Sequence, residues 1–240
     1  MKTLIAVPVF NEQKYVARVL DRILTHASDV LVVDDGSTDG TPAILAGRRD
    51  IIVHTHPQNL GYGESIIDAF DYAARHRYDW VITMDCDEQH EPERIVDFLA
   101  AIAADDADII SGSRYLRQDW GTTAAPADRR TINQIVTAMI ERHLGLSLTD
   151  SFCGFKAHRV AAMERLHLTV RGYAFPMQLW VQAQRAGLRI VELPVALIYN
   201  DPTRHFGGLL DNPDARLRHY QDVFFAELKL GAAMPIAAAR

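Results

Sequence analysis

The chain has 240 residues, of which 48% are hydrophobic and 23% are charged, and this near-average globular composition excludes a disordered, collagen-like or coiled-coil protein. Its 25 Lys and Arg residues against 31 Asp and Glu residues give a net charge of −6. Because an acidic chain is repelled by a phosphate backbone, no nucleic-acid partner is expected.

Short β-rich runs alternate with helical ones through the first half of the chain. Strands are predicted over residues 4–10, 30–33, 51–53, 80–84 and 109–110, and helices over 15–24, 41–46, 64–75 and 92–104. The alternation predicts an α/β fold with a mostly parallel central sheet flanked by helices. Ligands bind such sheets at the carboxyl edge, and the polar motifs of this chain follow its predicted strands.

The second half of the chain is less regular. Residues 116–128 are typical of a polar loop, 132–144, 175–186 and 215–230 of helices, and 152–157 and 190–198 of extended segments. There is no internal repeat and no low-complexity linker. Residues 1–240 are therefore predicted to form a single domain.

The last predicted helix combines an apolar stripe, typical of core packing, with a basic flank. The stripe is Leu217, Tyr220, Phe224 and Leu228, and the flank is Arg216, Arg218 and His219.

No apolar run approaches the roughly 20 residues of a spanning helix, and residues 1–10 lack a signal-peptide cleavage site. Two cysteines without a CxxC motif fit a reducing compartment. We expect a cytoplasmic protein, with peripheral contact at the inner face of the membrane left open by the basic flank.

Two polar segments follow the first two predicted strands. The motif PVFNE at 8–12 ends the first strand, and Asn11 is expected to cap the next helix. The octet DDGSTDGT at 34–41 forms a tight loop in which a carboxylate can hold a ribose or the edge of a base. Taken singly, the first segment is more typical of an ordinary helix cap, and a polar loop after a strand is more typical of an Asx turn; the exact octet shifts that balance toward a ligand site.

A third segment, DCDEQH at 85–90, directly follows the fourth predicted strand. Asp85 and Asp87 project to the same side if the strand continues. Together with Gln89 they offer the oxygen ligands suited to Mg²⁺ or Mn²⁺, which could neutralise a leaving diphosphate. A bare DxD is also typical of a solvated acidic turn. His90 is expected to shape this loop rather than bind zinc, because no Cys/His set surrounds it.

Basic residues follow the later strands or lie in loops that would cover the same edge of the sheet. They are Arg114, Arg129, Arg130, Lys156 and Arg204. Each of these residues alone is more typical of a surface salt bridge. The forked donors of arginine suit phosphate oxygens, however, so their shared placement favours anion binding. His54 and His56 would alternate along a continuation of the third predicted strand, and a structural role is favoured there over metal binding.

The order of these motifs resembles family 2 glycosyltransferases of the GT-A fold, above all the dolichol- and polyprenyl-phosphate mannose (sugar) synthases. The resemblance rests on PVFNE, DDGSTDGT, NLGYGESI (59–66), MDCDEQHEPE (84–93) and GSRY (112–115). It extends through CGFK (153–156), GYAF (172–175) and ELP (192–194). It implies a nucleotide-sugar and metal half at 1–115 and an acceptor half with the C-terminal helix at 116–240.

The resemblance also implies an activity and roles for individual residues. The activity is metal-dependent inverting transfer from a nucleoside-diphosphate sugar, of the GDP-mannose or UDP-glucose class, to a phosphate acceptor such as polyprenyl phosphate.

The nucleoside would be held by Pro8, Phe10, Glu12 and Asp35. The metal, Mg²⁺ or Mn²⁺, would be bound by Asp87 and Gln89. The predicted catalytic residues are Asp85, Asp87 and Arg114, with Asp85 at the nucleotide–sugar junction. The acceptor phosphate would be bound by Arg114 and Arg129 or Arg130, with Lys156 among the substrate-binding residues and Arg204 on the donor diphosphate.

Two departures from the family pattern bear on the chemistry. Gln178 stands where close family members carry Glu, and a carboxamide cannot act as a general base. This favours an acceptor that is already ionised, such as a phosphate monoester. Arg204 follows the ELP motif only after an insertion.

Three alternatives stay open. One is a soluble family 2 transferase acting on a metabolite or a glycan. Another is a sugar nucleotidyltransferase, although PVFNE lacks the Gly-rich basic loop of that class. The last is a non-catalytic nucleotide-sugar-binding module, against which the retained Asp85, Asp87 and Gln89 argue.

Overall fold

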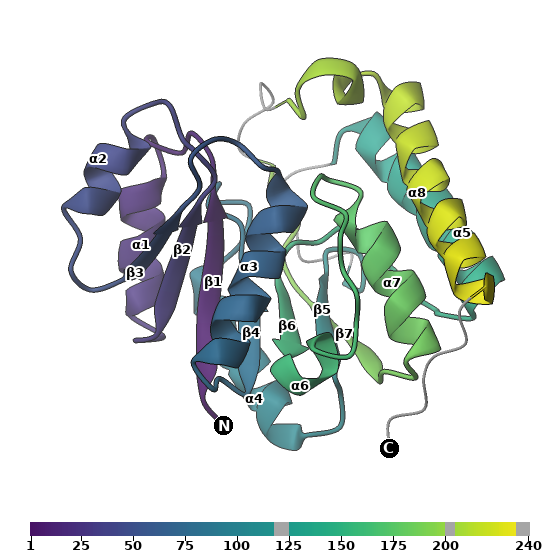
Figure 1. Ribbon diagram of the computed structural model, residues 1–240, viewed down its shortest axis with the longest axis horizontal. Coiled ribbons are helices and arrows are strands. Elements are labelled where there is room, and N and C mark those ends of the chain that lie inside the picture. Colours follow the sequence, from purple (N-terminus) through teal and green to yellow (C-terminus); the bar gives the residue numbers. More distant parts are fainter. Residues whose placement is uncertain (118–124, 200–204, 234–240) are drawn as a thin grey trace.

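A seven-stranded sheet in the order β3-β2-β1-β4-β6-β5-β7 forms the centre of the computed structural model (Figure 1). The structure describes residues 1–117, 125–199 and 205–233. The strands are β1 (Thr3–Val9), β2 (Val30–Asp34), β3 (Ile52–Thr55), β4 (Trp80–Thr83), β5 (Ile109–Ser113), β6 (Lys156–Arg159) and β7 (Ile190–Pro194).

Helices cover both faces of the sheet, as the sequence predicts. They are α1 (Val16–Leu24), α2 (Thr41–Ala46), α3 (Tyr62–Arg75), α4 (Ile95–Ala104), α5 (Ala127–Leu144), α6 (Val160–Met163), α7 (Phe175–Arg185) and α8 (Pro213–Ala233), with short 3₁₀ turns η1 (Pro92–Arg94) and η2 (Gly208–Asp211). One apolar core lies between the sheet and α1 and α4, and a second lies under α3, α5, α7 and α8. Figure 1 shows α3 and α7 on the near face, with α5 and α8 beside them.

The sheet is mostly parallel, as predicted, and one strand runs in the opposite direction. β1 pairs in parallel with both β2 and β4, so the carboxyl ends of these three strands meet at one edge. β6, however, runs antiparallel to both β4 and β5. Lys156 therefore stands opposite Thr83 and Ser111 in the middle of the sheet, at the start of its strand.

The start of α5 and the cap of α1 differ from the sequence expectation. α5 begins at Ala127, five residues before the predicted start, directly after Pro126. Its first turns are polar and look like loop in the sequence, yet they place Arg129 and Arg130 on a helix. The prediction that Asn11 caps α1 is wrong, because α1 begins only at Val16. Asn11 adopts φ 58° and accepts the N–H of Thr38 at 2.8 Å, so it stabilises the 34–41 loop instead.

α8 packs onto the core through the predicted stripe: Tyr220 and Phe224 are buried, and Leu217 and Leu228 are partly buried against them. The assignment of Arg216 to an outward basic flank is wrong. Arg216 is 3% exposed, and its guanidinium lies 2.5 Å from Asp128 on α5. A search of the described residues finds no helix with the length and apolarity needed to span a bilayer.

His158 on β6 gives the fold a specific sensitivity to acid. Burial, with the charge of Lys156, lowers the pKa of His158 to about 3, and its Nδ1 has no hydrogen-bond partner among the described residues. The folded state keeps this ring neutral while the unfolded chain takes up a proton below pH 6.5. Stability is therefore lost as the pH falls below 6.5.

We predict that His158→Leu removes this loss. Between pH 6.5 and 4.5 the free energy of unfolding of the wild type should fall by about 2 kcal/mol more than that of the variant. Urea unfolding at the two pH values measures the difference. His167→Leu, at an exposed histidine, is the control and should lose as much stability as the wild type. If His158→Leu also loses as much stability as the wild type between the two pH values, the assignment to His158 is contradicted.

Candidate active site

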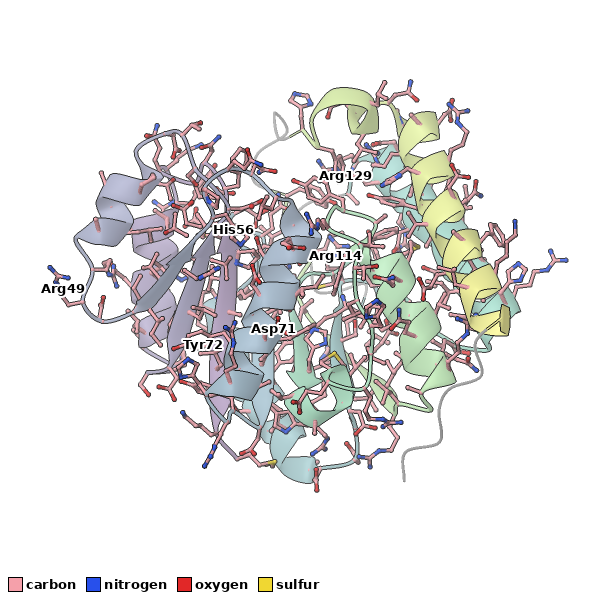
Figure 2. The ribbon with its side chains drawn as sticks, viewed as in Figure 1. Arg49, His56, Asp71, Tyr72, Arg114 and Arg129 are labelled. Carbon is pink, nitrogen blue, oxygen red and sulfur yellow. The ribbon has the colours of Figure 1, made fainter. Side chains whose placement is uncertain are left out.

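A pocket of about 570 Å³ opens at the carboxyl edge of β1, β2 and β4 and extends to α5 and α8. Most of the predicted site residues line it, namely Pro8, Phe10, Glu12, Asp35, Asp85, Asp87, Gln89, Arg114 and Arg129. Arg130 and Lys156 are not part of the lining, and Arg204 lies outside the described residues. Figure 2 shows His56, Arg114 and Arg129 at this end of the molecule and Asp71 farther along α3.

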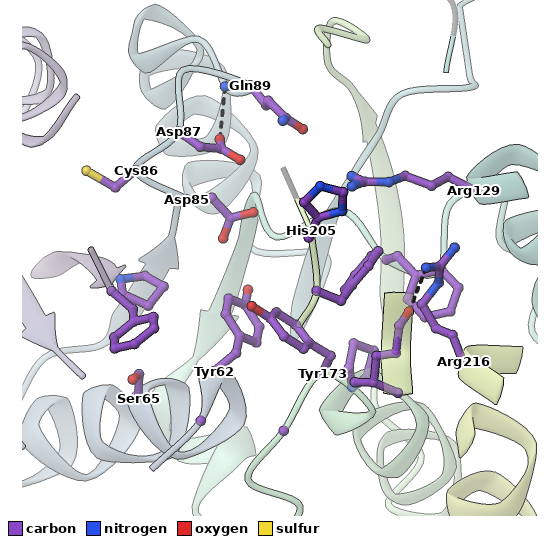
Figure 3. Close-up of a pocket in the computed structure, with 18 of the residues that line it drawn as sticks. Tyr62, Ser65, Asp85, Cys86, Asp87, Gln89, Arg129, Tyr173, His205 and Arg216 are labelled. Atoms are coloured by element: carbon purple, nitrogen blue, oxygen red, sulfur yellow. Dashed lines mark hydrogen bonds between the residues drawn. The ribbon is translucent and has the colours of Figure 1, made fainter. Parts of the chain in front are cut away.

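Charge is divided across the pocket. The carboxylates come from the ends of β1, β2 and β4, and they are Glu12, Asp35, Asp85 and Asp87. The guanidinium groups come from the end of β5 and from α5 and α8, and they are Arg114, Arg129 and Arg216. Figure 3 shows Asp85 and Asp87 across the pocket from Arg129 and Arg216. One side therefore suits a cation and hydrogen-bond donors, and the other suits an anion.

The loop after β4 presents three oxygen-bearing side chains to the acidic side. Asp87 Oδ1 accepts the backbone N–H of Gln89 at 3.0 Å, and Glu88 between them adopts φ 59°. The Glu88 carboxylate pairs with Arg18 on α1 at 2.5 and 2.6 Å, which ties this tight turn to the body of the protein. Carboxylate and amide oxygens are hard donors, so Asp87 and Gln89 fit Mg²⁺ or Mn²⁺.

A buried neutral histidine and a glycine lie next to Asp85. The backbone N–H of Asp85 donates to His90 Nδ1 at 3.2 Å, which leaves the ring proton on Nε2, 3.9 Å from Asp85 Oδ2. Burial lowers the pKa of His90 to about 4, so the ring is neutral at pH 7. A Cβ on Gly154 would lie 2.4 Å from Asp85 Oδ2. Only glycine leaves room there for the carboxylate.

Asp35 belongs to a buried hydrogen-bond chain that the sequence analysis missed. His56 Nδ1 lies 2.7 Å from Asp35 Oδ1, and His56 Nε2 lies 2.7 Å from Asp68 Oδ2. Asp35 also accepts the backbone N–H groups of Leu60 at 2.7 Å and Gly61 at 2.9 Å. Burial alone would lower the pKa of His56, but the two carboxylates raise it above its usual value.

His54, His56 and Asp68 lie close enough together to form a metal-ligand cluster. Both ring nitrogens of His56, however, already face carboxylate oxygens at hydrogen-bonding distance. That geometry fits a doubly protonated ring. The arrangement agrees with the structural role favoured for these histidines from the sequence.

Two stacked tyrosines lie between the acidic and basic sides. The rings of Tyr62 and Tyr173 are 6.1 Å apart and inclined by 16° (Figure 3). Burial and the nearby charge of Asp85 raise the pKa of both hydroxyls, so both stay protonated. A Cβ on Gly63 would lie 2.2 Å from Val170 O, so glycine permits this close approach of the Tyr173 loop to α3.

The basic side is built on buried ion pairs. Arg114 donates from Nε and Nη2 to the fully buried Asp150 at 2.6 and 2.9 Å. Burial would raise the pKa of Asp150, but the Arg114 guanidinium holds it below its usual value. Arg129 and Arg216 lie 4.8 and 4.4 Å from the ring centre of Phe206. The sequence showed Arg216 only as a charge flanking an apolar stripe.

Two predicted anion-binding residues point to other partners. The Arg130 guanidinium lies 3.8 Å from the ring centre of Tyr115. The Lys156 ammonium is buried and donates to Cys153 O, and burial lowers its pKa. Their assignment to the substrate stays a prediction without a pocket contact to support it.

Gln178 is a buried structural residue outside the pocket lining. Its Oε1 accepts the backbone N–H groups of Thr169 at 2.7 Å and Val170 at 2.9 Å. Its Nε2 donates to Glu227 Oε2 on α8 at 2.9 Å. A glutamate here would set one carboxylate against another. The amide therefore ties the Tyr173 loop and α8 to α7, and the departure from the family pattern has a structural reason.

We predict a pH signature for the His56 chain. A histidine pKa that is raised on folding adds stability below pH 6.5, and this contribution is lost as the pH rises through the raised value. Asp68→Asn should therefore destabilise the protein by about 1–3 kcal/mol at pH 6 and by less at pH 9. Urea unfolding of the wild type and the variant measures the destabilisation at each pH. Asp71→Asn, an exposed change on the same helix, should have the same free energy of unfolding as the wild type at either pH. Equal destabilisation by Asp68→Asn at pH 6 and at pH 9 would rule out the protonated ring.

Comparison with known proteins agrees with this geometry. The family model described as Glycosyl transferase family 2 matches residues 4–166. The chain is 31% identical over 225 residues to the undecaprenyl-phosphate mannosyltransferase of Micrococcus luteus, covering 88% of this chain and 90% of that protein. It is 30% identical over 209 residues to the polyprenol monophosphomannose synthase of Mycolicibacterium smegmatis, covering 81% of this chain and 76% of that protein.

A solved structure shows the same architecture. Glucosyl-3-phosphoglycerate synthase from Mycobacterium tuberculosis, in complex with Mn²⁺, uridine diphosphate and glucosyl-3-phosphoglycerate, superposes with a TM-score of 0.70 at 18% identity. The match covers 94% of this chain and 79% of that one. The GT-A fold predicted from the motifs is thereby confirmed. The chain belongs to glycosyl transferase family 2 and is a glycosyltransferase.

Proposed function

We propose that the protein moves a sugar from a nucleoside-diphosphate sugar to the phosphate of a polyprenyl phosphate, with inversion at the anomeric carbon. The observation that carries this proposal is the division of charge in the pocket, with carboxylates on one side and Arg114, Arg129 and Arg216 on the other. A donor with a metal-bound diphosphate suits the first side, and an acceptor phosphate suits the second.

The acidic side takes the donor. Pro8, Phe10, Glu12 and Asp35 hold the nucleoside, of the guanosine or uridine class, while Asp87 and Gln89 would hold Mg²⁺ or Mn²⁺. Such an ion neutralises charge on the departing diphosphate. Asp85, which lies beside His90 and Gly154, faces the nucleotide–sugar junction. The Mn²⁺ and uridine diphosphate bound to the mycobacterial neighbour support this assignment.

The basic side takes the acceptor. Arg114 and Arg129 bind the acceptor phosphate, and an oxygen of that phosphate attacks the anomeric carbon on the face opposite the diphosphate. The bond from that carbon to the diphosphate breaks, and its electron pair leaves with the nucleoside diphosphate. A phosphate monoester is ionised near neutral pH, so no proton has to be removed. This fits Gln178, which supplies no base and lies outside the pocket lining.

The acceptor class also has support from the relatives. The names of the two curated relatives, undecaprenyl-phosphate mannosyltransferase and polyprenol monophosphomannose synthase, favour a polyprenyl phosphate acceptor and mannose as the sugar. A polyprenyl chain stays in the bilayer, so the protein has to reach the membrane surface from the cytoplasmic side.

Release of nucleoside diphosphate tests the proposal directly. GDP-mannose and UDP-glucose are offered in turn with Mn²⁺, with and without a polyprenyl phosphate in detergent. We expect release from one donor, with a glycolipid product that forms only when the phosphate is present. Transfer to a glycan or a metabolite alone, or synthesis of a nucleotide sugar from a sugar phosphate and a nucleoside triphosphate, would contradict it.

Asp87→Asn tests the proposed metal ligand. The change keeps the size of the side chain but removes its charge, so we expect turnover at saturating Mn²⁺ to fall about 100-fold or more. Asp106→Asn makes the same charge change at an exposed site and should leave turnover unchanged. Wild-type turnover of Asp87→Asn would refute the metal assignment.

A further inference from the structure

Ser65 on α3 carries an unsatisfied hydroxyl at the pocket. Its side chain is 1% exposed, and its Oγ finds no hydrogen-bond partner within the described part of the chain. Four buried side-chain atoms share this property among the described residues, and Ser65 is the one whose residue lines the pocket. A buried hydroxyl without a partner destabilises the folded state, so this one calls for a physical reason.

The usual local solution is not used at Ser65. A helical serine or threonine commonly donates to the carbonyl four residues earlier, as Thr137 does to Asn133 O at 2.6 Å. At Ser65 the corresponding carbonyl, Gly61 O, accepts only the backbone N–H, at 3.2 Å. The hydroxyl therefore stays available for a partner that enters the pocket.

The position of Ser65 indicates which part of a ligand it would meet. Gly61, one helical turn earlier, donates its N–H to Asp35 Oδ2 at 2.9 Å, so Asp35 contacts the N-terminus of α3, the end of the helix that carries Ser65. Figure 3 shows Ser65 on the same side of the pocket as Cys86, away from Arg129 and Arg216. Its surroundings are therefore those assigned to the nucleoside.

We propose that Ser65 Oγ hydrogen-bonds the nucleoside of the donor, through the base edge or a ribose hydroxyl. The inference rests on the proposed function and adds a donor contact to it. A hydroxyl can both donate and accept, so it suits either group. Binding of the nucleoside supplies the partner that the unliganded protein lacks.

Ser65→Ala should consequently have two opposite effects. Without ligand, loss of an unsatisfied polar atom should leave the melting temperature unchanged or raise it. With ligand, loss of the hydrogen bond should weaken binding of the matching nucleoside diphosphate, GDP or UDP, by about three- to tenfold. Calorimetric titration with the nucleotide in the presence of Mn²⁺ measures binding, and thermal unfolding without ligand measures stability. Binding of inorganic pyrophosphate, which has no nucleoside, should not change.

Ser151→Ala is the matched control. Ser151 is fully buried, lies outside the pocket lining, and its Oγ is 3.1 Å from Thr137 Oγ1. Its removal should lower the melting temperature and leave nucleotide affinity unchanged, which is the reverse of the pattern expected at Ser65.

The outcomes separate failure of the proposed function from failure of the Ser65 contact. If the wild type binds neither GDP nor UDP, the proposed function fails and the Ser65 contact fails with it. If the wild type binds one of them and Ser65→Ala binds it equally well, only the Ser65 contact is overturned. An equal loss of pyrophosphate affinity would place Ser65 at the diphosphate and overturn the nucleoside assignment.

Discussion

Parallel pairing of β1 with both β2 and β4 is the constraint on which the candidate site depends. It brings the carboxyl ends of three strands to one edge, so Glu12, Asp35 and Asp85 meet although they are far apart in sequence. Carboxylates this close repel one another unless cations or hydrogen-bond donors offset their charge. The site is therefore prepared for a cation and for a ligand rich in donors.

Buried neighbours hold the charged side chains of the pocket in place. Asp35 accepts from His56 and two backbone N–H groups, the backbone N–H of Asp85 donates to His90, and Arg114 pairs with Asp150. These contacts restrict movement before a ligand arrives, so less ordering is needed on binding. These contacts also bury ionisable groups, so the stability of the fold depends on pH.

The donor side could be predicted from the sequence because each of its motifs directly follows a strand, and strand order places them together. The acceptor side could be predicted only in part. Arg216 and Tyr173 depend on how α8 and the loop before α7 pack against distant segments, through contacts such as that between Gln178 and Glu227. The inward direction of Lys156 follows from the antiparallel β6, which no local pattern signals.

In the proposed reaction the acceptor oxygen is already ionised when it meets the donor, which is why Gln178 can serve the fold and not the reaction. A comparison of sugar transfer to a polyprenyl phosphate and to the free polyprenol of the same chain length tests this most directly. We predict transfer to the phosphate and none to the alcohol. Comparable transfer to both acceptors would contradict it, because the alcohol requires a general base.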